Sequence, residues 1–137
     1  MSTIEITADL GATARAIGND GPISMLNLLR YREHADYAGR KDIAPCTGRE
    51  AYHQRYRAAF AKLAPVGLKV VWFGGVVAGI AIPDDERWDD VAIVGYPSFS
   101  AFRQVVESAA YAEHARPHRV AALADWRLIA MTEVDLG

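Results

Sequence analysis

The sequence predicts an α+β fold in which one antiparallel sheet carries helices on one face. Three observations predict it. Residues 87–114 combine a period-two strand pattern, a proline that ends the strand and a serine that caps a following helix. Residues 23–31 form a nearly continuous apolar run, which is typical of a strand buried on both faces. Between these stretches, Thr47 opens a Thr-Gly-Arg-Glu capping box that begins a helix.

Length and composition indicate a single domain over residues 1–137, with its core at about residues 22–131. Apolar residues make up 51% of the chain and charged residues 23%, as in an ordinary globular protein. The net charge of −2 leaves no basic surplus for phosphate groups, so we expect no nucleic-acid binding. A lone cysteine, and the absence of a signal peptide or an apolar run of about 20 residues, predict a cytoplasmic protein without membrane contact.

The first half of the chain is expected to contain an outer helix, a central strand and a second helix. Residues 7–17 have a helical pattern that ends at an Asn-Asp-Gly-Pro turn. A preceding proline and the short length favour a strand at residues 23–31, although Met and Leu also favour a helix there. Residues 32–46 show no periodicity and form a long loop. The helix that begins at Thr47 is expected to end at Pro65.

The second half is expected to supply a hairpin, two helices and the last strand. Residues 68–82 are strand-like, with two adjacent glycines that mark a bulge or bend. A turn at Pro83 then returns the chain into the strand and helix of residues 87–114. Pro117 suits the first turn of a further short helix that ends near residue 124. Residues 126–131 form the last strand.

This order of elements is that of a ferredoxin-like split β-α-β fold with an antiparallel four-stranded sheet and an extra N-terminal helix. Two helices cover only one side of such a sheet. The other side also carries apolar residues, so we expect a homodimer that packs sheet against sheet.

Four stretches carry a resemblance to a known family. They are W-D-D-V-A-I-V-G-Y-P-S-F-S-A-F, H-R-V-A-A-L-A-D-W-R-L-I-A, P-I-S-M-L-N-L-L-R-Y-R-E-H-A-D-Y and T-G-R-E-A-Y-H-Q-R-Y. Together they resemble the domain of unknown function 1330 family of the dimeric α+β barrel superfamily, over roughly residues 22–131. The resemblance implies the fold and the dimer, whereas the family has no settled activity. The wider superfamily includes cofactor-independent monooxygenases, isomerases and haem enzymes. One departure is Lys69, where the family usually has an arginine.

Two polar residues of the first strand are candidate catalytic groups. Strand alternation places Asn27 on one face of the sheet and Arg30 on the other. A buried asparagine could orient a carbonyl group or a dioxygen species, but it also needs hydrogen-bond partners in any fold. The sequence allows both a ligand-orienting role and a purely structural hydrogen-bonding role for Asn27.

Two histidines complete the catalytic candidates. His114 and His118 are four residues apart, which lets them share a helical face, but Pro117 lies between them. Acid–base use is favoured over metal or haem ligation, which would need a further ligand, and a capping role is the alternative. We therefore expect no metal and no cofactor.

Aromatic side chains are candidate ligand-binding groups, because a pocket for a flat organic molecule uses aromatics with a polar tip. The candidates are Tyr31, Trp72, Trp88, Tyr96 and Tyr111. By contrast, the tyrosines of the capped helix follow the amphipathic period, which favours core packing.

The functional hypothesis is a small-molecule pocket in each subunit of the dimer. Its ligand would be a small organic molecule, anionic or aromatic, and the basic and aromatic loop at residues 32–46 would cover it or simply be solvated. Cofactor-independent oxygenase or isomerase-type chemistry is one use of such a pocket. A non-catalytic ligand-binding or regulatory dimer is the alternative, and a dimer without a pocket is the third. The sequence does not decide whether the protein is an enzyme.

Overall fold

The protein consists of two layers, a β-sheet and a set of helices. The computed structural model describes residues 1–137. The four strands are β1 (Ile23–Tyr31), β2 (Lys69–Gly75), β3 (Asp90–Tyr96) and β4 (Leu123–Met131). They form a single sheet in the order β2-β3-β1-β4, and every neighbouring pair is antiparallel. The predicted α+β class with a four-stranded antiparallel sheet is confirmed, and β1 lies at the centre of the sheet as expected.

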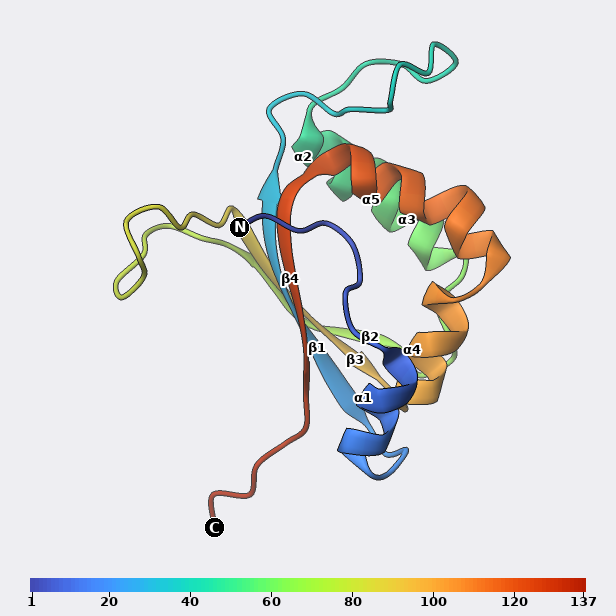
Figure 1. The fold of residues 1–137 in the computed structure, drawn as a ribbon, viewed down its shortest axis with the longest axis vertical. Helices are drawn as coiled ribbons and strands as arrows, with labels where there is room; N and C mark the ends of the chain where they lie inside the picture. The colour runs from blue at the N-terminus through green and yellow to red at the C-terminus, as the bar shows by residue number, and fades with distance from the viewer.

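The helices lie on one face of this sheet, and the other face is left open (Figure 1). A continuous helical rod follows the capping box, and its middle is a π-helical turn; a second rod near the C-terminus also contains one. None of the helices has the length and apolar character that crossing a bilayer requires. The helical elements are α1 (Leu10–Ile17), α2 (Gly48–Glu50), η1 (Ala51–Tyr56), α3 (Arg57–Ala61), α4 (Phe99–Val106), η2 (Tyr111–Ala115) and α5 (Arg116–Ala122).

Strand β1 alternates between buried and half-buried residues along its whole length. Met25, Asn27 and Leu29 belong to the buried set, which faces the helices, and Leu29 is completely enclosed. The expectation of burial on both faces therefore fails within one chain. The physical reason is that no element of the chain covers the second face, although its residues Leu26 and Leu28 are as apolar as those of the first.

The strand expected at residues 68–82 is much shorter than predicted. β2 ends at Gly75, which pairs with Asp90, the first residue of β3, so the residues beyond it have no strand to pair with. Residues 76–89 instead form a loop that projects from the sheet (Figure 1), and residues 76–85 of it are exposed. The pairing irregularity lies between Val70 and Trp72 rather than at the two glycines.

Other element boundaries shift by a few residues. Helix α1 begins at Leu10 rather than at residue 7, because the Asp9 side chain accepts a hydrogen bond from Ala12 N and caps it. Helix α5 ends at Ala122, and β4 begins directly after it, three residues before the expected start. The Ser98 cap of α4 and the capping box at residues 47–50 are confirmed.

Three backbone segments meet at Gly48, in the first turn of α2. Its N–H donates to the carbonyl of Arg32, and the N–H of Arg32 donates to the carbonyl of Ala122. A Cβ atom at Gly48 would lie 2.2 Å from Arg32 O and 2.6 Å from Ala122 O, both of them backbone atoms. Only glycine permits this approach, which fixes the start of the helix against the ends of β1 and α5.

Substitution of this glycine tests the close approach. We expect Gly48→Ala to destabilise the fold by at least about 2 kcal/mol, because backbone atoms rather than flexible side-chain ends must move. The free energy of unfolding from urea titration measures the effect. Gly11→Ala, within α1, is the matched control and should change stability by less than about 1 kcal/mol. Equal stability of the Gly48→Ala protein and the wild type would contradict the close packing.

Candidate functional site

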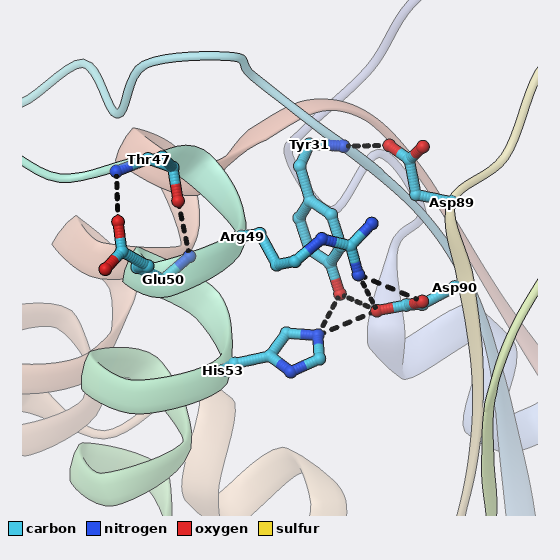
Figure 2. Close-up of polar contacts among 7 residues, drawn as sticks. All are labelled: Tyr31, Thr47, Arg49, Glu50, His53, Asp89 and Asp90. Carbon is cyan, nitrogen blue, oxygen red and sulfur yellow. Dashed lines mark hydrogen bonds and ion pairs between the residues drawn. The ribbon is translucent and has the colours of Figure 1, made fainter.

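Four polar side chains gather where the capped helix crosses the end of the sheet; we call them the Asp90 cluster (Figure 2). Tyr31 Oη donates to Asp90 Oδ2 at 2.6 Å. His53 Nε2 lies 2.7 Å from the same oxygen and 3.1 Å from Tyr31 Oη. Arg49 Nη1 donates to both carboxylate oxygens at 3.3 and 3.4 Å. The Asp90 residue is only 3% exposed, so its charge is neutralised and solvated by these three partners.

Local sequence explains why these side chains meet. The Thr47 side chain accepts from Glu50 N, and the Glu50 side chain accepts from Thr47 N, which fixes the first turn of the helix. Arg49 and His53 are four residues apart and therefore face the same way. On the sheet side, Asp89 Oδ2 accepts from the N–H of Tyr31 at 2.9 Å and holds the end of β1 beside the start of β3 (Figure 2).

The electrostatics of the cluster keep Asp90 charged and Tyr31 protonated. Burial alone would raise the pKa of Asp90, but hydrogen bonds from Tyr31 and His53 and the charge of Arg49 outweigh it, so the pKa lies below its ordinary value of 3.8. Burial raises the pKa of Tyr31 far above its ordinary value, and the hydrogen bond to Asp90 raises it further. Tyr31 is thus a hydrogen-bond donor at every physiological pH.

His53 is the partly exposed titratable member of the cluster, and Arg49 is more exposed still. Because the Asp90 carboxylate can only accept, the neutral imidazole carries its proton on Nε2 and its lone pair on Nδ1. Figure 2 shows Nδ1 on the ring edge turned away from Asp90, and no protein group hydrogen-bonds to it. The side chain is 31% exposed, and its ring packs edge-to-face on Phe73 at a centroid distance of 5.4 Å. An oriented imidazole with a free nitrogen can accept a proton.

An apolar cavity of about 260 Å³ opens beside this cluster, between the capped helix and the β2–β3 side of the sheet. We call it the Phe73 cavity. Arg57 is its only charged lining residue, and it lies one helical turn after His53. The Arg57 guanidinium stands 5.3 Å from the centre of the Phe73 ring and makes no ion pair. Apolar walls are supplied mainly by Tyr52, Phe60, Leu68, Val70, Phe73 and Val94.

Three of the sequence-predicted residues meet at a second, central cavity of only about 60 Å³. Asn27, Tyr96 and Tyr111 all line it. The Asn27 amide is satisfied, since Oδ1 accepts from Trp126 Nε1 at 3.1 Å and Nδ2 donates to backbone carbonyls. Tyr111 Oη accepts from the buried Arg119 at 2.7 Å. The cavity holds a few water molecules at most, and the polar groups of Asn27 and Tyr111 already have protein partners, so we assign these side chains a packing role.

Other predicted residues lie apart from both cavities. Arg30 lies on the open face of the sheet, opposite Asn27. Trp72 lies on that face too, more than half exposed. Trp88 is buried, and the Arg127 guanidinium carbon lies over its ring, 5.1 Å from the ring centre.

The predicted histidine pair lies on the outer surface of the helices. His118 Nδ1 is 2.7 Å from Tyr37 Oη, and burial together with Arg55 and Arg40 lowers the pKa of His118 below its ordinary value. His114 is largely exposed in the same surface groove. No group of three or more His, Cys, Asp or Glu side chains converges anywhere in the structure.

Sequence reasoning named Tyr31 but missed its partners His53 and Asp90. A signal for His53 existed, because the capping box at Thr47 fixes the phase of the helix and so the direction of residues 49 and 53. Asp90 carried no comparable signal. A carboxylate at the first residue of a strand is ordinarily solvated, and only the register of β1 and β3 brings it to Tyr31.

Removing the carboxylate at the centre of the cluster tests its structural weight. We expect Asp90→Asn to lower the free energy of unfolding by about 2–3 kcal/mol at pH 7, because three donors lose a charged acceptor. The native pKa is lowered, so this stabilisation is present at neutral pH and fades as the pH falls through and below 3.8. Urea titrations at pH 7 and at pH 3 measure both effects. Exposed Asp85→Asn is the control, and an acid dependence that Asp90→Asn leaves unaltered would contradict the assignment.

Comparisons with known proteins place the chain beside uncharacterised relatives. No protein-family model matches the sequence, and no curated protein matches it. A crystal structure of the methylated RPA0582 protein is 40% identical, covers 99% of this chain and 98% of its own, and has a TM-score of 0.81. A second structure of RPA0582, described as a protein of unknown function from Rhodopseudomonas palustris, is 38% identical, with a TM-score of 0.76 and coverage of 98% and 99%. With this identity over almost the full length of both proteins, the chain belongs to the family of the RPA0582 protein of Rhodopseudomonas palustris.

Proposed function

We propose that the chain is a ferredoxin-like subunit of a dimeric α+β barrel, as the resemblance to the domain of unknown function 1330 family implies. The strand order β2-β3-β1-β4 with antiparallel neighbours supports the ferredoxin-like assignment. The uncovered sheet face supports the dimer, because a sheet with apolar residues on both faces needs a partner on each (Figure 1).

A second copy of the chain suits this open face. Its apolar residues include Leu26, Leu28 and Ile93 at the centre, and Val71, Trp72 and Ile129 are about half exposed. On the β4 side of the face, Asp125 and Arg127 form an ion pair at 2.6 Å. Arg30, which lies opposite Asp125 in the strand register, adds one positive charge near the end of β1. A second copy related by a two-fold axis would pack on the apolar part of the face. Such a dimer would leave the Phe73 cavity on the helix side of each sheet.

A charge placed in the open face tests the dimer. We expect the wild-type protein to sediment as a dimer at micromolar concentration and Ile129→Asp to shift it to the monomer, because two aspartates would be desolvated across the axis. Analytical ultracentrifugation measures the masses. Val66→Asp, at a 98% exposed position in the turn before β2, should leave the dimer intact. A wild-type protein that sediments as a monomer refutes the proposal.

For the function itself, we infer that the Phe73 cavity binds a small organic anion with an apolar or aromatic body. The observation that carries this proposal is the single unpaired cation in an otherwise apolar cavity, Arg57. An anion there gains a charge-assisted hydrogen bond from the Arg57 guanidinium, while the ring walls take the apolar part. Binding alone would make the protein a ligand-binding or regulatory dimer. The Asp90 cluster beside the cavity favours chemistry instead.

A probe of matching chemistry tests the cavity. We expect 3-phenylpropionate to bind with a measurable affinity and its uncharged analogue 3-phenylpropanol to bind at least about tenfold more weakly, because only the former pairs with Arg57. Arg57→Gln should weaken 3-phenylpropionate by about tenfold and leave 3-phenylpropanol unchanged. Isothermal titration calorimetry or ligand-observed NMR gives the affinities.

Arg15→Gln, which removes an exposed charge from α1, is the control for the overall loss of one positive charge. It should bind both probes as the wild type does. Equal affinity of the acid and the alcohol for the wild-type protein would show that Arg57 does not recognise an anion. Failure of both compounds to bind would refute the cavity as a ligand site.

A further inference from the structure

We propose that His53 is a general base that removes a proton from the carbon next to a carbonyl group, with Asp90 as its positioning residue. The substrate class is a small 2-oxo acid with an aromatic or aliphatic side chain, and the reaction is the interconversion of its keto and enol forms. This inference rests on the proposed function, because Arg57 in the Phe73 cavity would hold the carboxylate.

The base and the cation lie along one line of the helix. His53 lies in η1 and Arg57 follows it after about one helical turn, so the two residues are separated by roughly 5 Å along the axis, a span that a small organic acid bridges. Both side chains contact the Phe73 ring, with the imidazole centroid at 5.4 Å and the guanidinium carbon at 5.3 Å. A substrate whose carboxylate pairs with Arg57 and whose body lies on Phe73 therefore extends towards His53.

The hydrogen bonds of the cluster determine which nitrogen of the neutral His53 ring is free to accept a proton. Asp90 accepts from both Tyr31 Oη and His53 Nε2, so in the neutral imidazole the lone pair lies on Nδ1, on the side away from the cluster (Figure 2). This arrangement resembles a carboxylate–imidazole pair in which the buried acid orients the ring and stabilises the cation formed by proton transfer. Here the carboxylate lies 2.7 Å from the ring nitrogen and is almost fully enclosed.

The reaction step balances without a co-reactant. Nδ1 takes the proton from C3 of the 2-oxo acid, the electron pair of the broken C–H bond forms a C2–C3 double bond, and the carbonyl π electrons move to the oxygen. The enolate oxygen then takes a proton from solvent, and the imidazolium returns its proton to solvent. No oxidant, reductant or second substrate is consumed.

The charged and titratable groups around His53 favour this transfer. Asp90 of β3 stabilises the imidazolium, while Arg49 of α2 shares that carboxylate and limits the effect. Tyr31 of β1 stays neutral, and Tyr52, the preceding residue of the helix, points into the core. Arg57 adds a positive charge near the enolate, where negative charge develops in the transition state.

Hydrogen–deuterium exchange of phenylpyruvate tests the proposal. In D₂O the protein should accelerate loss of the C3 proton signal in the NMR spectrum above the rate in buffer alone. His53→Gln keeps an N–H near the position of Nε2 but has no lone pair at the position of Nδ1, so it should slow the protein-dependent exchange by at least about a hundredfold. The affinity for 3-phenylpropionate should change by no more than about twofold. His114→Gln, at an exposed histidine, should exchange phenylpyruvate at the wild-type rate.

Asp90→Asn distinguishes a positioning role from a structural one. At a temperature where the variant is folded, the rate of exchange should fall, and the acid limb of the pH–rate profile should move to lower pH, because the imidazolium loses its carboxylate. If Asp90 had a purely structural role, the substitution would lower the exchange rate by the same factor at every pH, and the acid limb of the pH–rate profile would not move.

A measurement on the unaltered protein keeps the test independent of how well the variants fold. The ¹⁵N resonance of His53 Nδ1 should shift when phenylpyruvate is added, while that of His114 should not. Binding of 3-phenylpropionate without protein-dependent exchange, or exchange that His53→Gln leaves intact, would overturn the role of His53 and leave the binding proposal standing. Absence of both binding and exchange would overturn the two together.

Discussion

A single buried carboxylate ties the helical layer to the sheet. Asp90 begins β3, and its partners come from three other elements: Tyr31 from the end of β1, Arg49 from α2 and His53 from η1. An unpartnered charge at this depth would cost several kcal/mol, so the four groups hold one another in place. The position of the helix over β1, and with it the shape of the Phe73 cavity, depends on this arrangement.

The two faces of the sheet have separate uses. On the helix side, alternate residues of β1 and β3 enclose the core, and the β2 edge leaves the Phe73 cavity where the helix diverges from the sheet. The open side carries an apolar surface that its own chain does not cover. The period of two along each strand keeps these uses independent, because a substitution on one face leaves the residues of the other unchanged.

Local signals made much of the fold predictable. Pro97 and Ser98 mark the end of β3 and the start of α4, and the capping box at Thr47 marks the start of α2. The length of β2 could not be predicted, since the apolar pattern continues past Gly75 and only the start of β3 limits the pairing. The candidate site was harder still, because its members are brought together by strand register and helix phase rather than by any motif.

The π-helical turn η1 has a consequence for how this family can diverge. A π turn accommodates one more residue than an α turn, so deletion of a single residue within η1 would restore regular α geometry and leave the helix on either side facing the sheet as before. The capping box would still begin the helix, and the apolar stripe would still meet the sheet. If the deleted residue lay between His53 and Arg57, however, their spacing would fall from four residues to three and their common contact with Phe73 would be disturbed. A relative could therefore keep the fold and lose the proposed site through the loss of one residue.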